Sequence, residues 1–131
     1  MASPEATADS SVFVLTDKHL RALNPSGTVR FRVPSPFSRG GRSPNKTWTL
    51  ALIALPDSGV AVSDGEYKTV KFNRKGQLRW QHSVPHEDRM TGPPVAGPNG
   101  SIYIHTASWL YVIGPKGRER WRVPLETLRV Q

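Results

Sequence analysis

Residues 102–124 read IYIHTASWLYVIGPKGRERWRVP and contain the pattern that decides the fold. Two runs of β-branched and aromatic residues precede a turn that ends at Gly117, and Trp121 stands four residues after that glycine. β-Branched and aromatic side chains favour strands, and a glycine supplies the positive φ angle that a tight turn needs. The segment therefore predicts three short antiparallel strands in succession.

Two other segments repeat this pattern. They read VFVLTDKHLRALNPSGTVRFRVP (residues 12–34) and VAVSDGEYKTVKFNRKGQLRWQHSVP (residues 60–85). Their turn glycines are Gly27 and Gly76, and an aromatic residue again follows four residues later, at Phe31 and Trp80. The glycines are 49 residues (76 − 27) and 41 residues (117 − 76) apart. Several short strands per unit at such a period are typical of β-propeller blades.

A further strand is expected before the second unit, within residues 47–55, and before the third, within residues 92–96. The units of this single domain then cover about 12–34, 47–85 and 92–124. The first unit has no clear opening strand, and residues 1–10 are expected to be flexible. Residues 125–131 are strand-like and would complete a blade. Because helical periodicity with caps is absent, the predicted fold class is all-β, a partial propeller of about three four-stranded blades.

The segments Leu20–Gly27 and Leu110–Gly117, with their following aromatic residues, resemble the pyrroloquinoline-quinone-type (quinoprotein-like) β-propeller repeat. The resemblance covers roughly residues 12–124. It implies that Trp80 and Trp121 pack between neighbouring blades, with Phe31 as a substitution in the first unit. The family includes quinone-dependent dehydrogenases, outer-membrane assembly lipoproteins and sensor domains of bacterial kinases.

The dehydrogenases of this family hold the quinone and Ca²⁺ on the axis of a closed ring of blades. This chain has about three units and shows no acidic and Asn cluster for Ca²⁺ in its sequence. We therefore expect no cofactor, and pyrroloquinoline quinone with calcium only if the chain is part of a larger propeller enzyme. The alternative to a binding module is thus a fragment of a quinone-dependent oxidoreductase.

Three blades are fewer than the four to eight that typically close a propeller, so two flat blade faces would lie uncovered. Burying a large aromatic side chain contributes about 2–3 kcal/mol, which favours covering such faces. We therefore predict a non-catalytic interaction or scaffold module that binds another protein or a second copy of itself. The residues predicted for blade packing and assembly are Phe31, Trp80, Trp121, Trp109 and Tyr111.

The chain is basic, with 18 Lys and Arg against 10 Asp and Glu and a net charge of +8. Charged side chains on an outer strand protect the sheet edge, but they could also attract an acidic protein or, as a less favoured alternative, nucleic acid. The candidate basic surface consists of Arg30, Arg32, Arg79, Arg118, Arg120 and Arg122.

Residues that could bind a metal or act as nucleophiles are sparse. The chain has no Cys, which excludes a thiol nucleophile and a cysteine-type zinc site. His82 and His86 are close in sequence, but Pro85 prevents them from sharing a helical face, so no metal site is predicted. The sequence shows neither a secretory signal nor an apolar run long enough to span a bilayer, and this points to the cytoplasm.

Overall fold

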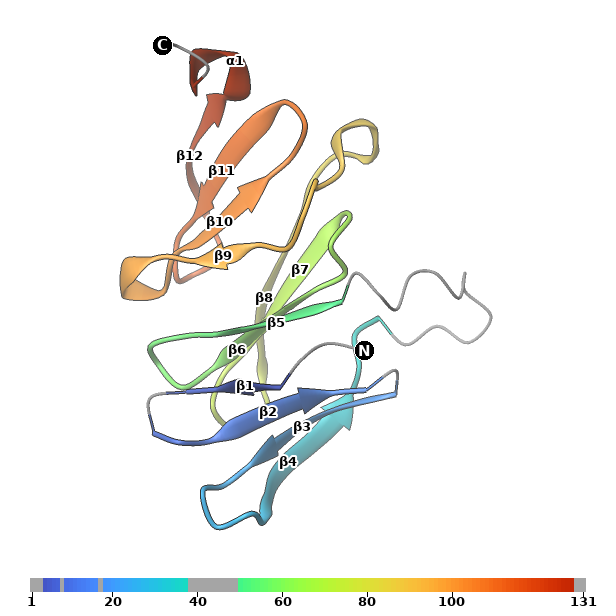
Figure 1. Ribbon diagram of the computed structural model, residues 1–131, viewed down its shortest axis with the longest axis vertical. Helices are drawn as coiled ribbons and strands as arrows, with labels where there is room; N and C mark the ends of the chain where they lie inside the picture. The colour runs from blue at the N-terminus through green and yellow to red at the C-terminus, as the bar shows by residue number, and fades with distance from the viewer. Residues whose placement is uncertain (1–3, 8, 17, 38–49, 129–131) are drawn as a thin grey trace.

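The computed structural model describes residues 4–7, 9–16, 18–37 and 50–128, whose strands form three four-stranded antiparallel sheets. Figure 1 shows the sheets one after another along the long axis of the molecule. The first sheet contains β1 (Glu5–Ala6), β2 (Val12–Leu15), β3 (His19–Leu23) and β4 (Val29–Pro34). The second contains β5 (Ala51–Ala54), β6 (Val60–Ser63), β7 (Lys68–Phe72) and β8 (Leu78–Ser83). The third contains β9 (Val95–Ala96), β10 (Ile102–His105), β11 (Trp109–Ile113) and β12 (Glu119–Pro124).

Little of the described chain is helical. It contains η2 (His86–Asp88), η3 (Pro98–Gly100) and α1 (Leu125–Leu128). Within the described ranges, no helix has both the length and the apolar character needed to cross a membrane. The prediction of an all-β chain built from three four-stranded sheets is confirmed.

The hairpin between the third and fourth strands is built alike in all three sheets. Gly27, Gly76 and Gly117 have φ angles of 92°, 85° and 88°, a region that glycine enters without steric cost. The register shifts by one residue just before each of these turns, which is a β-bulge. A bulge re-aims the side chains that follow it, so the aromatic residue four positions after each glycine points the same way in each sheet.

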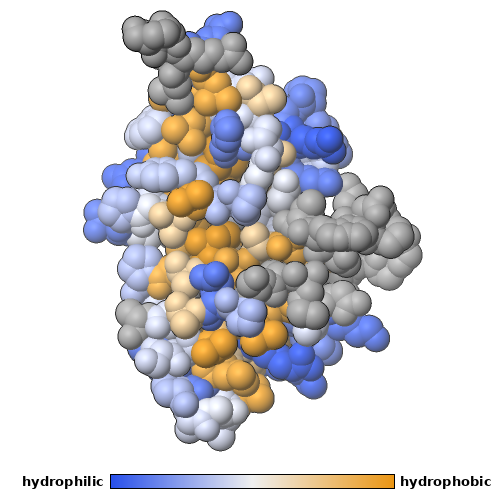
Figure 2. Space-filling model, viewed as in Figure 1, coloured by the Kyte–Doolittle hydropathy of each residue, from blue (hydrophilic) through white to orange (hydrophobic). Residues whose placement is uncertain are grey.

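Two apolar cores fill the spaces between the sheets. One joins the first and second sheets and includes Phe13, Leu20 and Phe72, whereas the other joins the second and third and includes Ile53 and Ile104. All four residues of β6 are buried, because the second sheet is covered on both faces. Figure 2 shows apolar residues in a band along the middle of the molecule, with hydrophilic residues on either side.

The two ends of the chain differ from the sequence prediction. Residues 1–10 were expected to be flexible, yet Glu5–Ala6 pair with β2 as the missing opening strand. Two residues are too few for sequence periodicity to reveal. The tail was expected to be a strand, but Leu125–Leu128 form one helical turn. Leu and Glu favour helix, and Pro124 before them lacks the N–H that would extend the ladder. Residues 129–131 lie outside the described residues.

Candidate interaction surface

Trp80 joins the second sheet to the third. It lies on β8 in the second sheet, and its ring covers the turn that ends at Gly117 in the third. A Cβ atom at Gly117 would lie 2.5 Å from Cγ of Trp80, so only glycine lets the ring approach this closely. The indole Nε1 donates a hydrogen bond to the carbonyl of Pro115, 3.0 Å away. This contact fixes both the position and the orientation of the ring.

Phe31 makes the equivalent contact between the first and second sheets. It lies on β4, and a Cβ at Gly76 would be 2.8 Å from its Cδ1. A phenyl ring cannot donate the hydrogen bond that Trp80 makes, but an ion pair between Asp9 Oδ2 and Arg74 Nε, 3.2 Å apart, links the same two sheets. Phe31 and Trp80 each dock on the turn glycine of the following sheet.

Trp121 occupies the same position in the third sheet but has no following sheet among the described residues. Its side chain is 49% exposed. At the other end of the molecule, a Cβ at Gly27 would meet no atom within 4 Å. The described chain thus ends on one side with an undocked aromatic ring and begins on the other with an uncovered turn glycine.

Trp109 and Tyr111, predicted as assembly contacts, both pack within the chain. Tyr111 is only 2% exposed and belongs to the core between the second and third sheets, and Trp109 is half-buried against the same core. The guanidinium of Arg122 lies 5.2 Å from the ring centroid of Trp109 and 4.9 Å from that of Tyr111. The sequence could not indicate which face of β11 packs in the core, because nearly every residue of this strand is apolar.

His82 adds a polar group to the core between the second and third sheets. Its ring meets that of Tyr111 edge-on, with 5.9 Å between centroids. Burial lowers the pKa of His82, and the nearby Glu119 carboxylate offsets this only in part. Burial also raises the pKa of the Tyr111 hydroxyl. Within the described chain, His82 Nδ1 and the Tyr111 hydroxyl are buried without hydrogen-bond partners. Both groups are therefore held in their neutral forms.

We expect this histidine to make the fold sensitive to acid. In the unfolded chain His82 takes up a proton as the pH falls through about 6.5, whereas the folded chain resists protonation until a lower pH. Stability is therefore lost as the pH falls below about 6.5. The first and third sheets carry Val33 and Val123 at the equivalent position, so His82→Val is the matched variant.

His82→Val should raise the free energy of unfolding at pH 7 by about 1 kcal/mol, because it removes a buried nitrogen without a partner. It should also flatten the loss of stability between pH 7 and 5. Urea unfolding of both proteins at a series of pH values measures this. Equal pH dependence in the two would show that other groups cause the sensitivity.

The predicted basic residues differ in their surroundings. Arg30 donates hydrogen bonds to Asn24 and Ser11, and Arg122 forms an ion pair with Glu119 at 2.8 Å. These two arginines serve packing and local structure. The remaining members of the set are exposed: Arg32, Arg79, Arg118 and Arg120.

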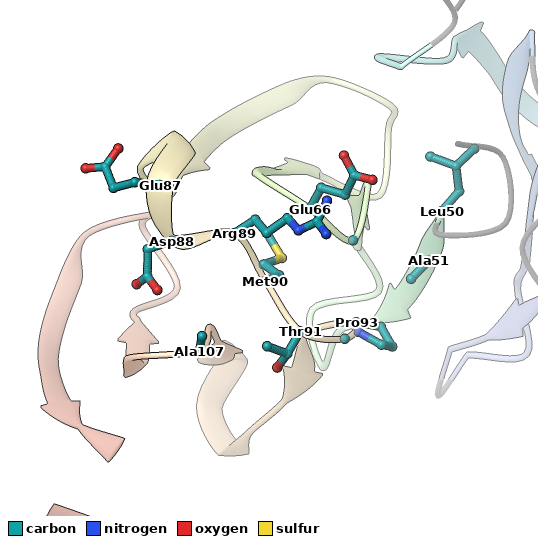
Figure 3. A pocket seen from close by; sticks show the side chains of 12 residues that line it. Leu50, Ala51, Glu66, Glu87, Asp88, Arg89, Met90, Thr91, Pro93 and Ala107 are labelled. Atoms are coloured by element: carbon teal, nitrogen blue, oxygen red, sulfur yellow. The ribbon is translucent and has the colours of Figure 1, made fainter. Parts of the chain in front are cut away.

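An open depression of about 800 Å³ lies between the second and third sheets. It is lined by the segment that links these sheets and by the turns beside it, and its acidic residues are Glu66, Glu87 and Asp88. Figure 3 shows these three carboxylates pointing in different directions. Asp88 accepts a hydrogen bond from Thr106 at 2.7 Å, which ties η2 to the third sheet.

This depression does not suit a calcium-dependent cofactor. Ca²⁺ requires six to eight converging oxygen ligands. Among the residues that the structure describes, no three His, Asp or Glu side chains converge to hold a metal ion. The three carboxylates of the depression therefore do not form a common ligand set.

Comparison with known proteins found no matching family model and no matching curated protein. Solved structures do match. BamB from Moraxella catarrhalis superposes with a TM-score of 0.67 and 17% identity, over 94% of this chain and 34% of that one. The chain has a β-propeller fold.

Two further solved structures agree. Virginiamycin B lyase from Staphylococcus aureus matches with a TM-score of 0.62 and 17% identity, over 89% of this chain and 39% of that one. The Pan2 WD40 domain from Neurospora crassa matches with a TM-score of 0.54 and 14% identity, over 88% and 33%. At these identities the likeness concerns the fold alone. The chain spans little more than a third of the propeller proteins it matches.

Proposed function

We propose that this chain is a protein-binding module whose free third-sheet face docks onto another protein through Trp121. The observation that carries the proposal is the 49% exposure of Trp121, whose counterparts Phe31 and Trp80 are both docked on a neighbouring turn. The β-propeller fold is consistent with an interaction role, as its likeness to BamB and a WD40 domain illustrates.

The residues around Trp121 support the same conclusion. Val112 lies directly across from Trp121 in the ladder, and Leu110 lies across from Val123, so these four side chains share one face of the third sheet. An exposed aromatic ring within an apolar patch is the usual centre of a protein interface. A partner that covers this face removes the ring from water and gains the same kind of contact that joins the sheets inside the chain.

Site-specific photo-cross-linking tests the proposal. Trp121 is replaced by the photoreactive residue p-benzoyl-phenylalanine in cells that express the chain, and covalent products are identified by mass spectrometry. Leu78, which is 54% exposed on β8, is the matched control position. We expect a defined protein adduct from position 121 and none from position 78.

Equal labelling from the two positions, or no protein adduct from position 121, would contradict the proposed function. The identity of the adduct is read separately. An adduct with a second copy of this chain and an adduct with a different protein would both support an interaction module. Which of the two forms shows which partner binds the Trp121 face.

A further inference from the structure

We propose that the partner of the Trp121 face is the first sheet of a second copy, so that two copies close a ring of six sheets. This inference rests on the proposed function and names its partner. It follows from a rule that the chain shows twice: the aromatic residue of one sheet covers the turn glycine of the next. Trp121 is the aromatic residue left over by this rule, and Gly27 is the glycine left over.

The uncovered turn of the first sheet contains the groups that Trp121 requires. In the existing junction, Trp80 donates its indole N–H to the carbonyl of Pro115, two residues before Gly117. Pro25 stands two residues before Gly27, in a turn closed by the same hydrogen bond from the glycine N–H to the first turn residue. The carbonyl of Pro25 is therefore the expected acceptor for Trp121 of the second copy.

The space over Gly27 is also open. A Cβ there would meet no atom within 4 Å, whereas a Cβ at Gly76 or Gly117 would collide with an aromatic ring. Gly27 nevertheless has the same positive φ angle as these two glycines. The turn is thus already in the shape that accepts a ring.

The free face of the first sheet carries both apolar and basic side chains. Phe13 and Leu15 of β2 lie in the core toward the second sheet, so by strand alternation Val12 and Val14 face the opposite side. Val14 lies across from Arg21, which lies across from Arg32, so this face offers two valines and two arginines to the third sheet of another copy. Glu126 follows β12 at the strand end that corresponds to Lys18 in the first sheet, since Leu125 N and Ser35 N make equivalent hydrogen bonds there. In a closed pair, an acidic and a basic residue therefore lie at corresponding ends of the two facing sheets.

A pair of copies with three described sheets each falls within the range at which propellers close. Propellers close with about four to eight blades. One copy supplies three sheets and three copies would supply nine, whereas two copies supply six. Because each contact is head-to-tail, the two junctions of the closed pair are identical, and each copy contributes one aromatic residue and one glycine turn.

Sedimentation of the purified chain tests this inference. We expect a mass of twice 14.5 kDa for the unmodified chain. Trp121→Ala removes the ring, and Gly27→Ala places a Cβ where the ring would sit. Each variant alone should associate at least about tenfold more weakly than the unmodified chain, the loss typical of an interface anchor. Leu78→Ala and Gly92→Ala, at exposed or open positions, are the controls and should leave the mass unchanged.

Mixing the two defective variants gives the decisive result. The Trp121→Ala chain still has an intact Gly27 turn, and the Gly27→Ala chain still has an intact Trp121. The mixture should therefore form a pair with one intact junction, and it should pair more tightly than either variant does alone. A contact in which both copies use the same patch would not be rescued by mixing. Gly27→Asn, which tolerates a positive φ better, replaces Gly27→Ala if that variant does not fold.

Raising the salt concentration gives a second measurement. Each copy carries a net charge of +8, so salt should strengthen pairing by screening the repulsion between copies. Pairing that persists in Trp121→Ala, or an unmodified chain that stays monomeric at every salt concentration, would overturn the second copy as partner. A cross-link from position 121 to another protein would then leave the proposed function standing, whereas no cross-link would end both.

Discussion

Trp80→Ala is expected to lower the free energy of unfolding by about 3 kcal/mol, whereas Trp121→Ala should change it by less than about 0.5 kcal/mol in the monomer. Both residues are tryptophans at the same position of the repeat. Trp80 fills the junction with the third sheet and donates a hydrogen bond to Pro115, so its removal leaves a cavity and an unpaired carbonyl. Trp121 has no neighbouring sheet to lose among the described residues.

Urea unfolding at a protein concentration low enough to keep the chain monomeric measures this difference. Trp80→Phe is an informative intermediate, because it keeps a six-membered aromatic ring near Gly117 but removes the five-membered ring of the indole together with its N–H. The loss of the hydrogen bond to Pro115 alone should lower the free energy of unfolding of Trp80→Phe by about 1 kcal/mol. Similar losses for Trp80→Ala and Trp121→Ala would mean that docking on the next turn does not hold the sheets together.

The second large effect is expected at the turn glycines. Gly117→Ala should destabilise the fold by about 3 kcal/mol or more, because its Cβ would lie 2.5 Å from Cγ of Trp80 and must displace the ring. Gly27→Ala should cost only about 1 kcal/mol, which is the strain of a positive φ for a residue with a side chain. The two glycines have φ angles of 88° and 92°, so this backbone cost is shared.

The difference between the two variants therefore isolates the contact with the aromatic ring. Thermal unfolding followed by circular dichroism gives the ranking, and the near-ultraviolet signal of Trp80 reports whether its ring has moved. In the double variant Trp80→Ala with Gly117→Ala, the steric part of the loss should disappear, so the two changes should not be additive. Strict additivity would place the cause of the Gly117 effect in the backbone alone.

Much of this arrangement could be predicted from the sequence, because its signals are local and repeated. The spacing between each turn glycine and the aromatic residue after it is constant, and that spacing is set within one hairpin. It identified the three sheets and their third and fourth strands. The two-residue strand β1 escaped detection because Glu5–Ala6 carry no period and are held only by pairing with β2.

The partners across each junction could not be predicted in the same way. Glycine at a turn is explained by its φ angle alone, so no sequence pattern indicates that the ring of Trp80 packs on Gly117. Likewise, His82 meets Tyr111 across two sheets, at a position where the other sheets carry valine. Asp9 and Asp57 occupy the same turn position in successive sheets, yet Asp9 pairs with Arg74 of the next sheet, whereas Asp57 pairs with Lys71 within its own sheet. The contacts between sheets depend on how the sheets stack.

Each junction between sheets combines the aromatic residue of one repeat with the turn glycine of the next. The boundaries of the junctions therefore do not coincide with the boundaries of the repeats. Replacing a whole repeat by another would change one residue in each of two junctions. In both junctions, an aromatic residue would then face a turn from a different context. A segment that starts at one aromatic residue and stops at the following turn glycine, such as residues 31–76, instead carries both halves of a junction together. To graft or lengthen this protein, one should therefore exchange segments that run from an aromatic residue to the following turn glycine, because each such segment contains a complete junction.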